Sequence, residues 1–368
     1  MPQKNRFAIL FAVLVTFSLT VSRKAAGESR PATARLVLTQ AAPPSATAKP
    51  FYEGKTIRLI VQTGTGTTND IAARIIAPHL SRHIPGNPNI VVQNMAGAAG
   101  IIAANYLYSI AKPDGLTIAA MGRANYLDQL VGKPEVKFDF RKFGWIGSFN
   151  RAPLMIACRA DTGYTSIDSI RAAKIPPRFA DGATGSIGYA FSELVATALN
   201  LKFKQILGFV GGGRALDLAL ERGEADCRAT SDITVIRPPW PEWIEKRSVS
   251  FLVQQGPKKS RLLPQEVPTI YELAPVGAKP VLVLMDVMLG YTEFDRPYAA
   301  PPGVPGEQLL ILRNSFESTL HDAKFSEEAK KHFDWDGSYL SGEKLQRKID
   351  QIVTQPPDVI KRVKEILE

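Results

Sequence analysis

One repeated pattern limits the folds open to this chain: a short β-branched strand, a glycine-containing loop and then an amphipathic helix. It is clearest near the start, where the strand expected at 56–62 leads through two glycines into a helix that begins near Asp70. Further strands are expected at 90–92 and 117–121. Strands that alternate with helices in this way form a parallel sheet with helices on its faces. Ligands of such sheets bind beyond the carboxyl ends of the strands, where these glycine loops lie.

The same pattern returns in the middle of the chain and predicts a second sheet. Strands are expected at 154–157, 178–180, 204–209, 225–228 and 249–254, and the tail is expected to form helices near 306–320, 326–332, 342–352 and 357–367. The chain has 368 residues, 45% of them hydrophobic, so two α/β lobes could each bury a core and face each other across a cleft. We expect lobe 1 to comprise residues 51–153 and 250–368, and lobe 2 to comprise residues 154–249.

The first fifty residues have the composition of an export leader followed by a linker. Lys4 and Arg6 precede an apolar run at 7–21, which matches a secretory signal and is short for a membrane span. We expect a signal peptide over residues 1–26 and a linker rich in Ala, Pro, Thr and Ser over 27–50, and therefore a periplasmic protein. Several small-residue sites suit cleavage, and basic residues after the apolar run leave an uncleaved anchor open.

The excess positive charge is concentrated in this leader and linker. Six of the 45 basic residues and one of the 35 acidic residues precede residue 49, so the formal charge of +10 falls to +5 for the remainder. That remainder has no basic run interleaved with aromatic residues, which a nucleic-acid groove would need. We therefore expect no nucleic-acid partner.

The loops at the strand ends of lobe 1 carry groups that bind an anion with little added charge. Residues 63–69 offer hydroxyl groups, an amide and the N–H groups of a helix start. The loop after the second strand repeats this design, and the third strand is followed by an arginine whose guanidinium suits a carboxylate. The candidate ligand-binding residues of lobe 1 are Thr63, Thr65, Gly66, Thr67, Thr68, Asn69, Asn94, Gly97, Ala98, Ala99 and Arg123. Asp70 is expected to cap the helix, because a carboxylate would repel an anion.

The corresponding loops of lobe 2 offer hydroxyl groups and glycines. Hydroxyl groups at 184–189 lie at an expected helix start, and the glycines at 211–213 let main chain approach a ligand closely. Ser231 and Asp232, which follow the strand that begins at Ala225, either line the cleft or lie in a plain turn. The candidate residues of lobe 2 are Thr184, Gly185, Ser186, Tyr189, Gly211, Gly212 and Ser231.

Short motifs in a fixed order resemble one known family. They are I-R-L-I-V at 57–61, V-V-Q-N at 91–94, G-A-A-G at 97–100, P-D-G at 113–115, L-E-R-G-E-A-D at 220–226, V-P-T at 267–269 and A-P-P-G-V-P at 300–305. From about residue 51 onward the chain resembles the solute-binding receptors of tripartite tricarboxylate transporters, the Bug-type extracytoplasmic receptors. The resemblance implies a two-lobed α/β periplasmic-binding-protein fold, a type II-like Venus flytrap whose lobes are each a mainly parallel sheet flanked by helices.

The resemblance also implies a function. Such a receptor closes on a small organic carboxylate, held largely by main-chain amides and waters, and delivers it to a two-component membrane permease of the tripartite tricarboxylate type. We expect a monomer. Departures from the family pattern leave the ligand open: T-G-T at 65–67 replaces Pro-Gly-Gly, Ala99 and Ile101 replace Gly and Asn, and V-G at 210–211 replaces a Tyr-Lys pair.

Other chemistries are disfavoured by the same sequence. The first loop lacks the third glycine and the later acid of a dinucleotide-binding motif. His79 and His83 have a metal-binding spacing without a neighbouring further ligand, so we expect a solvated helix end and neither a metal nor a cofactor. Cys158 and Cys227 are expected on strands, and their pairing is left open. Without paired acids or an activated nucleophile, we expect no enzyme; an exported enzyme on the same fold and a membrane-anchored sensory receptor are the alternatives.

Overall fold

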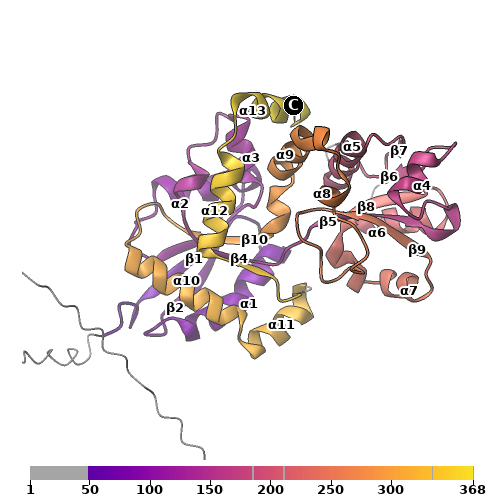
Figure 1. Cartoon of the computed structure of the whole chain (residues 1–368). Coiled ribbons are helices and arrows are strands. Elements are labelled where there is room, and N and C mark those ends of the chain that lie inside the picture. Colours follow the sequence, from indigo (N-terminus) through magenta and orange to yellow (C-terminus); the bar gives the residue numbers. More distant parts are fainter. Residues whose placement is uncertain (1–48, 185, 210–211, 334, 368) are drawn as a thin grey trace, which may run out of the picture. The chain divides into compact units, whose positions relative to one another are not determined.

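Two sheets organise the chain, and the computed structural model describes residues 49–184, 186–209, 212–333 and 335–367. The expected signal peptide and nearly all of the expected linker lie outside the described residues. Helices flank both sheets (Figure 1). None of the helices in the described part of the chain combines the length and the hydropathy that a membrane crossing requires.

The first sheet draws its strands from both ends of the described chain. Its order is β11-β4-β10-β3-β1-β2, and its strands are β1 (Thr56–Val61), β2 (Asn89–Asn94), β3 (Thr117–Ala120), β4 (Gly144–Phe149), β10 (Arg296–Ala300) and β11 (Tyr339–Ser341). β1 pairs in parallel with β2 and β3, whereas β10 is antiparallel to both β3 and β4. β10 therefore lies between β3 and β4, which run in the same direction as each other and opposite to β10.

Helices cover both faces of this first sheet. One face carries α1 (Thr68–His83), α10 (Gly306–Leu320) and α11 (Ala323–Phe333), and the other carries α2 (Ile101–Ser109), α3 (Asn125–Leu130) and α12 (Gly342–Val353). Successive residues of β1 point to opposite faces. Leu59 and Val61 accordingly pack into the core under α1, and Ile60 packs into the core under α2 and α12. Burial on both faces fixes β1 and so fixes the loop that follows it.

The second sheet is made from the middle of the chain. Its order is β7-β6-β8-β5-β9, and its strands are β5 (Leu154–Arg159), β6 (Arg178–Ala180), β7 (Lys204–Ile206), β8 (Cys227–Ser231) and β9 (Val249–Gln254). Its helices are α4 (Ile167–Ala172), α5 (Ile187–Leu199), α6 (Gly213–Glu221) and α7 (Trp240–Glu245). β6 is parallel to β7 and β8, and β5 is antiparallel to β8 and β9.

The pairing of the strands sharpens the expected division into lobes. β1 to β4 share one direction and β6 to β9 share one direction, but the pairs that involve β5, β10 and β11 are antiparallel, so both sheets are mixed where mainly parallel sheets were expected. The expected return to lobe 1 at residue 250 falls inside β9, which pairs with β5. The second sheet therefore extends to Gln254, and the chain returns to the first sheet between β9 and β10.

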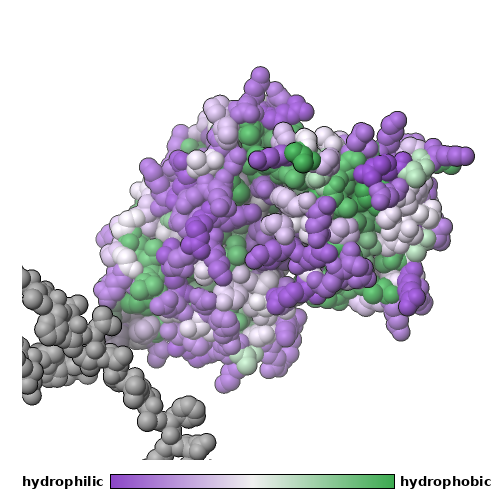
Figure 2. Space-filling model, viewed as in Figure 1, coloured by the Kyte–Doolittle hydropathy of each residue, from purple (hydrophilic) through white to green (hydrophobic). Residues whose placement is uncertain are grey.

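Three further helices follow β9 or end the chain. They are α8 (Ile270–Leu273), α9 (Lys279–Met288) and α13 (Pro357–Leu367). α9 packs against α5 of the second sheet and also against α12 and α13. The surface is mainly hydrophilic, with hydrophobic side chains gathered where α5 and α9 lie (Figure 2).

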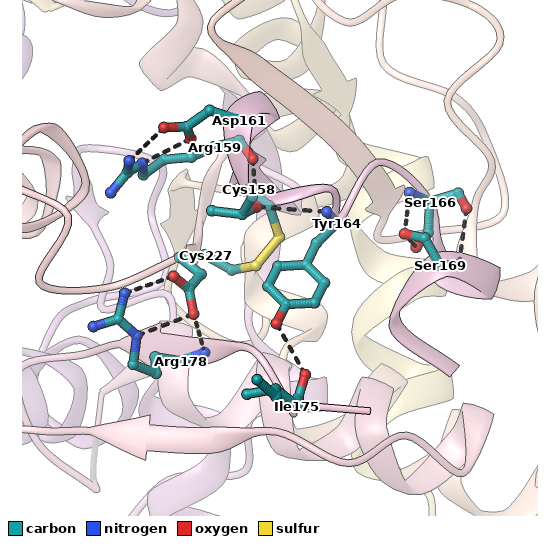
Figure 3. The surroundings of a disulfide bond; sticks show 11 residues. Cys158, Arg159, Asp161, Tyr164, Ser166, Ser169, Ile175, Arg178 and Cys227 are labelled. Atoms are coloured by element: carbon teal, nitrogen blue, oxygen red, sulfur yellow. Dashed lines mark hydrogen bonds and ion pairs between the residues drawn. A yellow bond between two sulfur atoms is a disulfide. The ribbon is translucent and has the colours of Figure 1, made fainter. Parts of the chain in front are cut away.

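A disulfide links two strands of the second sheet. Cys158 of β5 and Cys227 of β8 are bonded, are opposite each other in the antiparallel register and are fully buried (Figure 3). The neighbouring residues Arg159 and Arg178 form ion pairs with Asp161 and Asp226. The pairing that the sequence left open is thus present.

Candidate functional site

A cavity of about 850 Å³ lies at the carboxyl ends of β1 and β3. We call it the strand-end cavity. Its described wall consists of Gln62, Thr68, Asn69, Ala99, residues 121–125, Leu127, Asp128, residues 131–134, Arg237, Asp295, Arg296 and Leu367. Arg237 follows β8 of the second sheet, and Asp295 and Arg296 lie at the start of β10, so elements of both sheets meet at this cavity.

The charge of this cavity is positive. Among the described residues that line it, Arg123, Lys133, Arg237 and Arg296 are basic, and only Asp128 and Asp295 are acidic. Asp295 accepts hydrogen bonds from both Arg123 and Arg296, and Lys133 Nζ lies 2.7 Å from Asp128 Oδ1. The hydrogen bond and the charge of Asp128 raise the pKa of Lys133. An excess of two positive charges in a concave site attracts an anion.

Arg123 lies at the accessible part of this wall, as its place after β3 predicts. Its side chain is 39% exposed, and its guanidinium is 5.2 Å from the centre of the Tyr291 ring. The ion pair with Asp295 restrains the guanidinium while leaving part of it open to the cavity. Sequence reasoning found only this cation, because Arg237 and Arg296 belong to segments for which it predicted no element. Arg237 could have been found from its place after the strand expected at 225–228, whereas Arg296 had no such signal because no strand was expected at 296–300.

The first loop is built by hydrogen bonds among its own side chains. Thr67 is the N-cap of α1: its Oγ1 accepts from the Asp70 N–H at 3.3 Å and donates to the Gly64 carbonyl at 2.9 Å. Thr63 Oγ1 lies 2.6 Å from Thr67 Oγ1. The expectation that Asp70 caps the helix is therefore wrong, because Thr67 occupies that position. Of the first-loop candidates, Thr68 and Asn69 line the cavity, while Thr63, Thr65, Gly66 and Thr67 do not.

Asp70 joins the first loop to the second strand. Its buried carboxylate accepts from Arg74 Nε at 3.0 Å, from the Gly66 N–H at 2.8 Å and from Asn94 Nδ2 at 2.9 Å. The hydrogen bond from Arg74 is the largest of the effects that lower the pKa of Asp70 to about 2. Asn94 also donates to the Thr63 carbonyl. Its amide is thus engaged within the protein, so the structure places Asn94 behind the loop and not in the cavity wall.

The loop that follows β2 contributes one residue to the strand-end cavity. Ala99 lines the cavity, and its carbonyl accepts from Asn125 Nδ2 at 3.1 Å, whereas Gly97 and Ala98 lie outside the wall. Only glycine fits at position 122, because a Cβ there would lie 1.9 Å from Asn125 Oδ1 and 2.5 Å from Gln62 Oε1. Sequence reasoning did not single out Gln62 or Asn125, although both lie beside the loops it identified.

The described candidate ligand-binding residues of lobe 2 do not line the strand-end cavity. Thr184 and Tyr189 line a different cavity, of about 1180 Å³, between α5, α9 and α13. Ser186 is the N-cap of α5, where its Oγ accepts from the Tyr189 N–H at 3.1 Å. Gly212 is the N-cap of α6 with φ of 67°, and Ser231 ends β8. Gly185 and Gly211 lie outside the described residues.

The two histidines of α1 have structural partners. His79 Nε2 is 2.8 Å from Glu328 Oε2, and His83 Nε2 is 3.1 Å from Asp322 Oδ2. His79 is buried, so the expected solvated helix end is wrong for this residue, because α11 packs over it. In the part of the chain that the structure describes, no group of three or more His, Cys, Asp or Glu side chains is arranged to hold a metal ion.

Comparison with known proteins places this architecture among receptors. A family described as the tripartite tricarboxylate transporter family receptor matches residues 72–364. A UPF0065 protein of Bordetella bronchiseptica is 26% identical over 152 residues, which cover 41% of this chain and 44% of that protein. The chain thus spans about half the length of the curated relatives it matches.

Solved structures confirm the fold. A TctC solute-binding protein from Polaromonas, solved without ligand, has a TM-score of 0.66 at 21% identity, covering 86% of this chain and 99% of that one. The R. palustris protein Rpa4515, solved with adipate, has a TM-score of 0.51 at 20% identity, covering 84% and 97%. The expected two-lobed periplasmic-binding-protein fold is therefore confirmed.

Proposed function

The chain belongs to the tripartite tricarboxylate transporter receptor family, and we propose from this that it is an extracytoplasmic receptor for a small organic carboxylate. It captures the carboxylate between its lobes and delivers it to a two-component membrane permease. The adipate seen with Rpa4515 supports a carboxylate as the ligand class. We also propose that the protein works as a monomer in the periplasm.

One observation carries this proposal: the described residues of the strand-end cavity give it an excess of two positive charges at the carboxyl ends of β1 and β3. A carboxylate there accepts hydrogen bonds from the Arg123 guanidinium, whose planar fork matches its two oxygens. Thr68 and Asn69 add a hydroxyl and an amide at the start of α1, where the helix dipole also favours negative charge. These groups give the carboxylate directional partners.

Closure of the lobes completes the proposed mechanism. The chain crosses between the sheets twice, from β4 to β5 and from β9 to β10. A small rotation about these crossings brings Arg237 toward the first-sheet part of the cavity and expels water. Charge interactions strengthen when water is excluded, so closure and binding reinforce each other. The closed form is then the one that the permease recognises.

The alternative of an exported enzyme is less well supported by the cavity's side chains. Asp128 and Asp295 are each engaged by basic side chains, Asp128 by Lys133 and Asp295 by two arginines. The oxygens of both carboxylates are thus engaged by basic side chains of the protein, which leaves these acids poorly placed to exchange protons with a substrate. The described wall thus offers binding groups, which favours the receptor.

A thermal-shift screen against a panel of organic carboxylates tests the proposal. A ligand at 100 times its dissociation constant raises the free energy of unfolding by about 2.7 kcal/mol, which gives a readily measured shift. We expect carboxylates to raise the midpoint and uncharged analogues of the same shape to leave it unchanged. If neutral sugars or metal ions raise the unfolding midpoint and no carboxylate does, the proposal is overturned. N-terminal sequencing of the exported protein tests the periplasmic assignment: an intact Met1 favours the anchored sensory receptor.

A further inference from the structure

The second cavity, of about 1180 Å³, differs in character from the strand-end cavity. We call it the helix-lined cavity. Its apolar wall is formed by Ala190, Leu194, Val281, Leu284, Met288, Val359, Ile366 and Leu367 of α5, α9 and α13. Figure 2 shows hydrophobic side chains on the surface in the region of α5 and α9. Ile366 and Leu367 are 44% and 46% exposed, so part of this apolar wall faces solvent.

The charges around the helix-lined cavity cancel. Lys279 and Arg362 are basic, and Glu193 and Asp358 are acidic, so its described wall carries no net charge. The described wall of the strand-end cavity, in contrast, carries an excess of two positive charges. An anionic group is therefore favoured in the strand-end cavity, and an uncharged apolar group in the helix-lined cavity.

The two cavities are neighbours. Leu367, at the end of α13, lines both of them. Thr184 and Tyr189, which come from the loop and helix start after β6, line the helix-lined cavity. These residues belong to the carboxyl edge of the second sheet, where ligands of α/β sheets bind. Leu367 thus connects the cavity that contains the first-sheet loops with the cavity that contains the apolar wall.

We propose that the ligand is an amphipathic carboxylate. Its carboxylate binds at Arg123 in the strand-end cavity, and its aliphatic or aromatic body passes Leu367 and packs between α9 and α13. This inference rests on the proposed function, since it assigns the other end of the same ligand. The volume of the helix-lined cavity, about 1180 Å³, exceeds the range of about 300 to 1,000 Å³ for small-molecule sites and is far more than a short-chain acid fills.

Titration calorimetry with butyrate, hexanoate, octanoate and decanoate tests the inference on the intact exported protein. Burial of each additional methylene should raise the affinity by about threefold to fourfold, so the dissociation constant should fall steadily along the series. Decanol lacks the carboxylate and should bind much more weakly than decanoate. An affinity that stays constant beyond butyrate, or decanol binding as tightly as decanoate, would overturn the inference.

Two pairs of variants locate the apolar body. Leu284→Gln places an amide in the helix-lined cavity, and Leu310→Gln makes the same change on α10, outside both cavities. We expect Leu284→Gln to reduce the gain per methylene by at least half while butyrate affinity is unchanged, and Leu310→Gln to change neither. Ile366→Gln is a second test at an exposed site that does not endanger folding, with the exposed Ile175→Gln as its control. An undiminished gain in both Leu284→Gln and Ile366→Gln would contradict the inference.

The outcomes separate this inference from the proposed function. If butyrate binds, loses affinity in Arg123→Ala, and longer chains bind no better, the receptor function stands and the amphipathic ligand is excluded. If no acid of this series binds but another carboxylate of the thermal-shift panel does, the receptor function stands and the amphipathic ligand is excluded. If no carboxylate of the panel binds, the proposed function fails, and the inference fails with it.

Discussion

In the proposed receptor, Arg123 is the residue on which carboxylate binding depends most directly. Its ion pair with Asp295 and its position against the Tyr291 ring hold the guanidinium in one place before a ligand arrives. A preorganised guanidinium loses little rotamer freedom on binding, so more of its hydrogen-bond energy appears as affinity.

We therefore expect Arg123→Ala to weaken carboxylate binding by about tenfold to a hundredfold, the range for loss of a charged hydrogen bond. Titration calorimetry measures the change. Arg222→Ala is the matched control, because Arg222 is exposed at the end of α6 and lines neither cavity. Equal affinities for Arg123→Ala and the unaltered protein would remove Arg123 from the site.

Asp232 is a buried acid next to the crossing between the sheets. Its N–H donates to the Pro153 carbonyl at 2.8 Å, and its Oδ2 accepts from Ser260 Oγ at 2.5 Å. Burial raises the pKa of Asp232 to about 7; nearby Asp336 also raises it, while the Ser260 hydrogen bond and the charge of Arg151 lower it. The folded protein therefore holds this proton at a pH where the unfolded chain releases it.

The sign of the resulting pH dependence follows from that difference. Between about pH 4 and pH 7 the folded state binds more protons at Asp232, so its contribution to stability falls as the pH rises. We expect the stability of the unaltered protein relative to Asp232→Asn to drop by about 2 to 3 kcal/mol between pH 5 and pH 8. Urea unfolding at both pH values measures this. The exposed Asp168→Asn is the control, and a pH-independent difference for Asp232→Asn would refute the assignment.

At the scale of elements, the sequence pattern predicted the strands and helices that carry their own signals. The bounds expected for β6, β9, α10 and α13 agree with the structure, because clear apolar patterns are bounded by turn residues there. β10 was missed: its R-P-Y-A-A sequence lacks β-branched residues, and it is a strand because it fits between β3 and β4. Propensity is weak evidence where pairing with distant strands decides the conformation.

The same limit applies to the candidate site. Thr68, Asn69, Ala99 and Arg123 were predicted because they directly follow strands of one lobe, and they line one cavity. The lobe 2 candidates lie elsewhere because their positions depend on how the two sheets and α9 pack. Asn94 does not line the cavity because its amide donates hydrogen bonds to Asp70 and to the Thr63 carbonyl. Neither effect has a local sequence signal.

The disulfide between β5 and β8 is the covalent tie of the second sheet, and it closes a loop with a sequence separation of 69. Closing a loop of that size restricts the unfolded chain, so we expect its loss in a Cys158→Ala/Cys227→Ala variant to cost about 2 to 4 kcal/mol of unfolding free energy. Carboxylate affinity should be unchanged, because neither cysteine lines a cavity. Urea unfolding with and without reductant measures the effect. The variant should be insensitive to reductant, and an unaltered protein equally insensitive would contradict the prediction.

At the scale of the whole described chain, one buried amide ties the two crossings together. Gln255 Oε1 accepts from the Leu154 N–H at 3.0 Å and from Thr292 Oγ1 at 3.1 Å, and its Nε2 donates to the Leu289 carbonyl at 3.2 Å. Residues from both crossing segments thus share one hydrogen-bonded cluster. The cluster holds the two crossing segments together at the place where the proposed closure would have its hinge.

A crystal structure of the protein with the carboxylate that gives the largest thermal shift locates the ligand. We expect the carboxylate within hydrogen-bond distance of the Arg123 guanidinium, between the start of α1 and the end of β3, with Arg237 closer to it than in the ligand-free protein. A carboxylate bound away from the strand-end cavity, with Arg123 still contacting only protein groups, would refute carboxylate capture at Arg123.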